Sequence, residues 1–124
     1  MENSKIKNFT DLKAWQEAHK LVLLVYKATA KFPEQEKFGL TNQMRRAAVS
    51  VSSNIAEGFS RGTSKDKTQF YTMSHGSLSE LQSQILIGRD LKYFDQIDSN
   101  NLFDQLDITA RLLTGLKRTA MSRN

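Results

Sequence analysis

Apolar residues recur at steps of three and four positions along four segments of this chain. That spacing places them on one face of an α-helix, so it predicts four amphipathic helices, over residues 11–31, 42–61, 64–93 and 100–121. The positions expected to face the core are, in chain order, Leu12, Trp15, His19, Val22, Tyr26, Thr29; Met44, Ala48, Val51, Ile55, Phe59; Phe70, Met73, Ser77, Leu81, Ile85, Gly88; Leu102, Leu106, Thr109, Leu113, Leu116 and Ala120.

Residues that favour helix ends lie close to these boundaries. Thr10 and Thr41 are the expected N-caps of the first two helices, and Thr63 with Asp66 resembles the N-cap pair of the third. Pro33 is expected to end the first helix, because the residue before a proline is pushed out of the α region.

Two features of the helices predict tight contacts. Gly76 and Gly88 each weaken an isolated helix by about 1 kcal/mol relative to alanine, a cost that close helix packing at both positions would offset. Residues 21–25 are apolar on every side of the helix. A helix of this kind is either deeply buried or lies at a subunit interface.

Four helices with short connections predict an all-α fold, an antiparallel up-down-up-down four-helix bundle that forms a single domain over residues 1–124. One proline and six glycines in 124 residues are too few for the turns of a β-rich domain. No apolar run approaches the ~20 residues of a membrane-spanning helix. The first residues lack the pattern of a signal peptide. We therefore expect a cytoplasmic protein with no membrane contact.

The sequence contains no recognisable constellation of catalytic or metal-binding residues. The two histidines, His19 and His75, are far apart and lack ligand partners at helical spacing, so they are expected to be packed side chains. The chain has no cysteine and no phosphate loop, and the serines around Ser50 lie in no nucleophile motif. We expect no enzyme activity, no metal and no cofactor.

Polar residues interrupt the apolar pattern of the second helix at Arg45, Asn54 and Glu57. One of the adjacent arginines, Arg45 or Arg46, is expected to pair with Glu57 or with Glu80 of the third helix. The predicted structural polar network comprises Arg45, Asn54, Glu57 and Glu80. Direct contact of the arginines with phosphate is the alternative.

A net charge of +5 and a sequence pI of about 9.6 are compatible with nucleic-acid binding, although many basic proteins bind none. An antiparallel bundle would bring some of the basic residues together at its ends, and an ordinary solvated surface is the alternative. No aromatic residues interleave with these charges, so contacts would be mainly to phosphate. The candidate nucleic-acid-binding residues are Arg46, Arg61, Lys65, Lys67, Lys117 and Arg118; Lys5, Lys7, Lys13 and Arg123 add to the charge near the chain ends.

The segment 45–58, RRAAVSVSSNIAEG, resembles the signature of the bacterial four-helix bundle proteins related to open reading frames in 23S rRNA intervening sequences. The resemblance extends over about residues 9–116. Its other elements are Phe9-x-x-Leu12-x-x-Trp15, Phe32-Pro33-x-x-Glu36-x-x-Gly39-Leu40, Phe70 and Gly76-Ser77-x-x-Glu80.

This resemblance implies an antiparallel four-helix bundle that assembles into a ring-like homopentamer, with no known catalytic activity. A similar protein in diversity-generating retroelements is a basic, barrel-shaped accessory protein that binds nucleic acid and a reverse transcriptase. One fold hosts many roles, so family membership alone does not assign a function.

Two functional hypotheses follow. The first is a non-enzymatic nucleic-acid-binding or nucleoprotein-accessory module, with RNA the expected ligand, DNA the alternative and a protein as a further partner. The second is an oligomeric scaffold or protein-interaction module whose positive charge only keeps it in solution. Salt separates the two, because phosphate binding weakens steeply with ionic strength and apolar binding does not.

Overall fold

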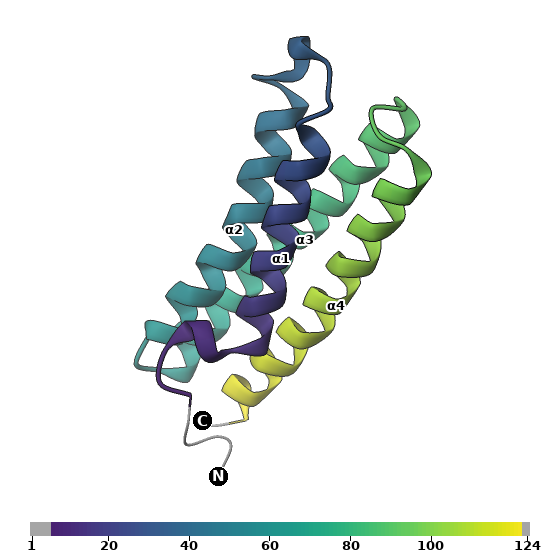
Figure 1. Ribbon diagram of the computed structural model, residues 1–124. Coiled ribbons are helices and arrows are strands. Elements are labelled where there is room, and N and C mark those ends of the chain that lie inside the picture. The colour runs from purple at the N-terminus through teal and green to yellow at the C-terminus, as the bar shows by residue number, and fades with distance from the viewer. Residues whose placement is uncertain (1–5, 123–124) are drawn as a thin grey trace.

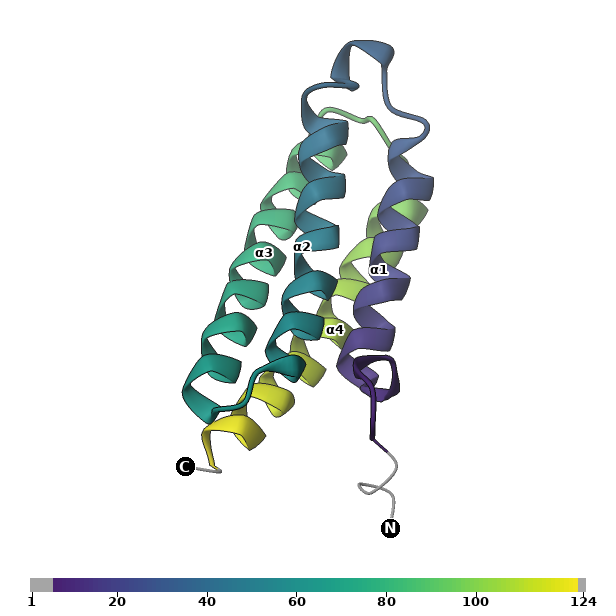
Figure 2. The ribbon, with the colours of Figure 1, turned by 90° about the vertical axis from the view of Figure 1, so that its left-hand side faces the viewer.

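The structure is a computed structural model that describes residues 6–122. Four long helices follow one another along the chain: α1 (Lys13–Thr29), α2 (Leu40–Ser60), α3 (Ser64–Asp90) and α4 (Gln96–Met121). Two short 3-10 helices, η2 (Phe9–Asp11) and η3 (Glu34–Glu36), precede α1 and α2. The long helices alternate in direction and form one elongated bundle (Figures 1 and 2). The predicted all-α, four-helix bundle is confirmed.

Each long helix packs against two others around the bundle, in the cyclic order α1, α2, α3, α4. The α2–α3 turn lies at the same end as the start of α1 and the end of α4, whereas the α1–α2 and α3–α4 connections lie at the opposite end (Figure 1). None of the helices in residues 6–122 has the length and apolar character needed to cross a membrane.

Helix starts agree with the predictions only in part. Thr63 caps α3 as predicted, because its side chain accepts a hydrogen bond from the Asp66 backbone N–H at 3.1 Å. Thr10 does not cap α1: Asn8 caps the preceding η2, and the extended backbone of Leu12 separates η2 from α1. Thr41 is likewise no cap, since α2 begins at Leu40 and buries Thr41 within its first turn.

The last helical boundary also moves. α3 ends at Asp90 rather than near residue 93, and Lys92 then adopts a positive φ of 62° that reverses the chain. α4 begins at Gln96, four residues earlier than predicted, because the Asp95 side chain caps it by accepting from the Asp98 backbone N–H at 2.8 Å.

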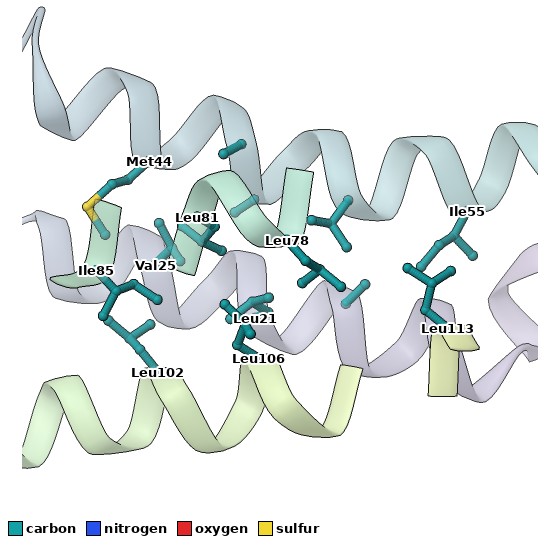
Figure 3. Packing of buried hydrophobic residues seen from close by; sticks show 14 of the residues in the cluster. Leu21, Val25, Met44, Ile55, Leu78, Leu81, Ile85, Leu102, Leu106 and Leu113 are labelled. Carbon is teal, nitrogen blue, oxygen red and sulfur yellow. The ribbon is translucent and has the colours of Figure 1, made fainter. Parts of the chain in front are cut away.

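The core consists mainly of aliphatic side chains that all four helices direct inward (Figure 3), and it also contains the buried rings of Phe32, Tyr71 and Phe94. The predicted stripes of α2 and α4 are buried there, except that Phe59 and Leu116 are only partly covered. In α1 the stripe is shifted by one position: His19 and Tyr26 are exposed, and the residues that face the core are Ala14, Ala18, Leu21, Val25 and Ala28.

In the first half of α3 the stripe is shifted by one position in the opposite direction, toward the C-terminus. Met73 is 49% exposed and Tyr71 only 2%, so the stripe runs through Tyr71, Ser74 and Leu78 before it joins the predicted Leu81. The Ser74 hydroxyl is satisfied in the core, where it donates to the Val51 carbonyl of α2 at 2.7 Å.

The two glycines of α3 differ in their surroundings. A Cβ at Gly88 would lie 3.1 Å from Phe94 and 3.3 Å from Phe32, so the predicted close packing is confirmed there. A Cβ at Gly76 would meet no other part of residues 6–122 within 4 Å, so the same prediction is wrong for Gly76 within the described residues.

Candidate nucleic-acid interface

The antiparallel topology gathers positive charge at the end of the bundle where the α2–α3 turn lies (Figures 1 and 2). We call this the basic end and define it as the described residues 6–14, 57–69 and 115–122. It carries three carboxylates, those of Asp11, Glu57 and Asp66. Its seven cationic side chains are those of Lys7, Lys13, Arg61, Lys65, Lys67, Lys117 and Arg118. Lys5 and Arg123 lie outside the described residues.

The opposite end has a different balance. Residues 29–40 and 87–100 contain four cationic and five anionic side chains, and Lys31 pairs there with Asp98 at 2.8 Å. The net charge of the protein therefore lies mostly toward the basic end. Because exposed charges farther apart than about 10 Å are screened from one another at 0.1 M salt, a local excess matters more for binding than the total.

Helix dipoles account for only part of this excess. Arg61 follows the C-terminus of α2, and Lys117 and Arg118 lie near that of α4, where a cation is stabilised by about 0.3–1 kcal/mol. Lys13 and Lys65, in contrast, occupy the first turns of α1 and α3, where the same dipole disfavours a cation. Both side chains are exposed and form no salt bridge among the described residues, although Lys13 has a Coulomb interaction with Glu17, one turn later. The helix dipole therefore does not explain these two lysines.

Arg61 is held on the surface by two neighbours. Its guanidinium pairs with the Glu57 carboxylate at 2.6 Å and lies over the Phe70 ring, 4.6 Å from the ring centroid. The pair joins residues four apart, and such exposed pairs contribute only about 0.3–0.5 kcal/mol. The charge of Arg61 is thus partly neutralised, but its position against α3 is well defined.

Lys67 has a mainly structural role. Its ammonium donates to the backbone carbonyls of Phe59, at 2.7 Å, and Gly58, at 3.4 Å, at the C-terminus of α2. It also lies 5.3 Å from the centroid of the Phe59 ring. Lys67 therefore caps α2 and is less available to a ligand than the exposed Lys65.

Lys117 and Arg118 line a shallow groove between α3 and α4 together with His75 and Thr114. His75 is partly buried there. Burial first, and then the charge of Lys117, lower its pKa below the usual value of 6.5. The sequence predicted only that His75 is a packed side chain. It did not predict the groove, because His75 and the lining residues of α4 are far apart in the sequence and come together only where α3 packs against α4.

Arg46 does not belong to the basic end. It lies fifteen residues before Arg61 on α2, which corresponds to about 22 Å along a helix. It lines two other shallow depressions, one beside Tyr26 of α1 and one beside Glu80 of α3. The six candidate residues thus occupy two separate regions, and only five of them lie together.

The predicted network of Arg45, Asn54, Glu57 and Glu80 is wrong as a single cluster. Arg45 turns toward α1 instead: its Nε donates to Thr29 Oγ1 at 2.9 Å and its guanidinium lies over the Tyr26 ring, 4.5 Å from the centroid. The cause is geometric, since the α1–α2 interface offers Arg45 an uncharged acceptor and an aromatic face close to its own level of the bundle.

The other three members have local partners. The Asn54 side-chain amide donates to Ser50 Oγ at 3.0 Å, and Ser50 in turn bonds to Ser77 of α3 at 2.8 Å. Glu57 pairs with Arg61, and Glu80 accepts a long hydrogen bond of 3.5 Å from Gln84. The polar link between α2 and α3 is therefore made by hydroxyls rather than by an ion pair.

Among residues 6–122, no three histidine or carboxylate side chains are grouped closely enough to hold a metal ion. The candidate site is a cationic surface at one end of an antiparallel four-helix bundle, and these features place the chain in the class of small, basic, all-helical bundle proteins. Residues 10–115 match the family model described as the 23S rRNA-intervening sequence protein. The chain belongs to this family, and the resemblance in the sequence is confirmed.

A solved structure supports the fold. The chain is similar to a protein of unknown function from the S23 ribosomal protein family of Bacteroides thetaiotaomicron, with 15% sequence identity and a TM-score of 0.75. The similarity covers 84% of this chain and 97% of that one. No protein of curated function matches the chain significantly. Neither the family description nor that of the solved structure names a catalytic activity.

Proposed function

We propose that this protein is a non-enzymatic RNA-binding or nucleoprotein-accessory module whose basic end contacts RNA phosphates. The observation that carries the proposal is the gathering of seven cations against three carboxylates at one end of the bundle. Exposed lysines at helix N-termini, Lys13 and Lys65, support it most directly, because they oppose the helix dipole. The family description, with its reference to 23S rRNA, makes RNA the first ligand to test.

We also propose that the protein acts as a homo-oligomer, a pentamer by its resemblance to the family. Leu23 and Tyr26 on the outer face of α1 are 57% and 43% exposed, and Val49 of α2 is 39% exposed near Tyr26. A contact between subunits would cover these apolar groups. Several basic ends on one particle would then bind one RNA with an avidity above that of a single bundle.

The test is fluorescence anisotropy of a labelled structured RNA across a salt series, with the mass of the protein in solution measured in parallel. Each duplex phosphate contact contributes about −0.9 to the slope of log affinity against log salt concentration, and each single-stranded contact about −0.7. The double variant Lys13→Ala/Lys65→Ala should make the slope shallower by about 1.4 to 1.8.

A matched control removes the same charge from the other side of the molecule. Lys27 and Lys37 are exposed on the last turn of α1 and in the α1–α2 connection, toward the opposite end. Lys27→Ala/Lys37→Ala should leave the slope unchanged. Equal losses in both variants would show that only the total charge matters. No binding at low salt would favour the alternative, an oligomeric scaffold that binds proteins.

A further inference from the structure

The groove between α3 and α4 near the basic end is lined by His75, Thr114, Lys117, Arg118, Met121 and Ser122. We infer that this groove is a phosphate-binding subsite in which His75 takes up a proton as the phosphate binds. Assigning that phosphate to RNA rests on the function proposed above. The subsite itself rests on the residues of the groove.

The groove has cations and hydroxyl groups but no carboxylate. None of its six lining side chains is acidic, and neither residues 67–79 of α3 nor residues 108–122 of α4 contain an aspartate or glutamate. The ion pair on this part of α4 is formed by Arg111 with Asp107, at 2.7 Å. Within the described residues, no carboxylate of α3 or α4 near the groove would compete with a bound anion for the charges of Lys117 and Arg118.

The polar groups of the lining fit a phosphate group, while most of the exposed lining surface is apolar. Lysine and arginine provide charge-assisted hydrogen bonds, and the hydroxyl of Thr114 can donate to a further phosphate oxygen, whereas the Ser122 hydroxyl donates to the Thr119 carbonyl at 3.0 Å. His75, when neutral, has one N–H donor, and a proton from solvent gives its imidazole a second donor and a positive charge. A bound phosphate therefore favours the protonated form of His75 by Coulomb attraction, whereas Lys117 disfavours that form by Coulomb repulsion.

The surroundings of His75 contain few other groups that titrate. Lys117 and Arg118 face the groove from α4, and Tyr71 lies one turn earlier on α3. Burial raises the pKa of Tyr71 to about 12, so it stays neutral near pH 7. On the other side of α3, α2 places Ser50 and Val51 near this level, through their contacts with Ser77 and Ser74. Proton uptake near neutral pH thus falls to His75.

The sign of the linkage follows. Without ligand, burial and Lys117 hold the pKa of His75 below 6.5, so the ring is neutral at pH 7.5. Binding of phosphate raises that pKa, and a shift of one unit corresponds to a tenfold change in affinity at a pH below both values. Affinity should therefore increase as the pH falls from about 7.5 to about 5.5.

The experiment uses labelled oligouridine at constant ionic strength between these two pH values. Its phosphodiesters and uracil bases do not titrate in this range, so a change in affinity reports on the protein. We expect an increase of about three- to tenfold for the unmodified protein. His75→Gln should bind equally well at the higher pH and show a smaller increase. His19→Gln is the matched control, because His19 is the other histidine of the chain and lies on α1 against Trp15.

A second measurement separates this inference from the proposed function. The pKa of His75 is followed by NMR in sodium chloride, in sodium phosphate of equal ionic strength, and with oligouridine. An increase with oligouridine supports the subsite as part of the RNA interface. An increase with phosphate alone, together with no RNA binding, would keep the subsite for free phosphate and refute the RNA function.

Two results would overturn the subsite. One is a pKa of His75 that neither ligand changes. The other is salt-sensitive RNA binding whose pH dependence is the same in His75→Gln as in the unmodified protein. That second result would overturn the subsite but leave the proposed RNA function in place. Far-UV circular dichroism of each variant verifies that the bundle is intact.

Discussion

Gly58 of α2 is the position where the structure makes the sharpest prediction about packing. A Cβ at this residue would lie 2.6 Å from Cε1 and 2.9 Å from Cδ1 of the Tyr71 ring, and 3.2 Å from Cβ of Phe70. Tyr71 is only 2% exposed, so its ring cannot move aside without disturbing the core. Gly58→Ala should therefore force α2 and α3 apart locally.

The magnitude follows from two opposing effects. Alanine in place of glycine stabilises a helix interior by about 1 kcal/mol. Overpacking a filled core costs about 1–3 kcal/mol, and contacts below 3.0 Å with a buried ring place this substitution at the upper limit. We expect a net loss of about 2 kcal/mol in the free energy of unfolding. For a chain of this size, that lowers the melting temperature by about 5–10 °C.

Gly76→Ala is the matched control on the partner helix. Among the described residues, no atom beyond its own helix backbone and chain neighbours lies within 4 Å of its Cβ position, so only the helix preference remains and the variant should gain about 0.5–1 kcal/mol. The assay is urea unfolding followed by far-UV circular dichroism. A Gly58→Ala variant as stable as the unmodified protein would refute the close α2–α3 approach. A concentration-dependent loss in Gly76→Ala would show that another copy covers α3 there.

Three further predictions concern polar groups. The Oε1 atom of Gln84 is buried without a hydrogen-bond partner in the described part of the chain. Gln84→Met should therefore raise the free energy of unfolding by about 1 kcal/mol in the same urea assay. A decrease in that free energy would contradict the unpaired acceptor. The Leu40 N–H and then the Tyr93 hydroxyl lower the pKa of Glu36 below 4.5, so its contribution to stability is complete above that pH and is lost as the pH falls through the folded-state value. Glu36→Gln should accordingly lose stability at neutral pH and match the unmodified protein in acid, which unfolding curves at several pH values would check. Arg45→Lys should cost about 1 kcal/mol, because an ammonium reproduces neither the hydrogen bond to Thr29 nor the stacking on Tyr26, and an unchanged midpoint in urea would count against both contacts.

The architecture was predictable from the sequence where a helix has one clear apolar stripe. In α2, Met44, Val51 and Ile55 alternate with serines and charged residues, and these three are fully buried. The register of α1 was not predictable in the same way. Its run of apolar residues from 21 to 25 supplies two possible stripes, and the choice depends on the small residues Ala14 and Ala18, which let a neighbouring helix come close.

The hydrogen-bond partners of side chains on neighbouring helices were harder to predict than the buried face of each helix. Arg45 has carboxylates within its own helix and on α3, and pairing by charge was the natural expectation. In the structure, the Arg45 side chain instead donates to the Thr29 hydroxyl, which itself donates to the Val25 carbonyl at 2.7 Å. The Thr29 hydroxyl donates one hydrogen bond within its own helix and accepts another from Arg45. Such an acceptor does not recur at a fixed spacing in the sequence, so the periodicity of apolar residues could not identify it.

At the basic end, the topology of the bundle brings together positive charges that are scattered along the sequence. Its cations come from three stretches that are far apart in the chain. Three reversals of direction place two helix starts and two helix ends side by side (Figure 1). The dipoles of these ends cancel in sum, since two are positive and two negative. Selection for helix stability alone would therefore place cations at the two C-termini and anions at the two N-termini, and the lysines at the starts of α1 and α3 depart from that rule. An anionic ligand of the kind proposed above would account for the lysines at both helix starts, although Asp66 in the first turn of α3 follows the rule.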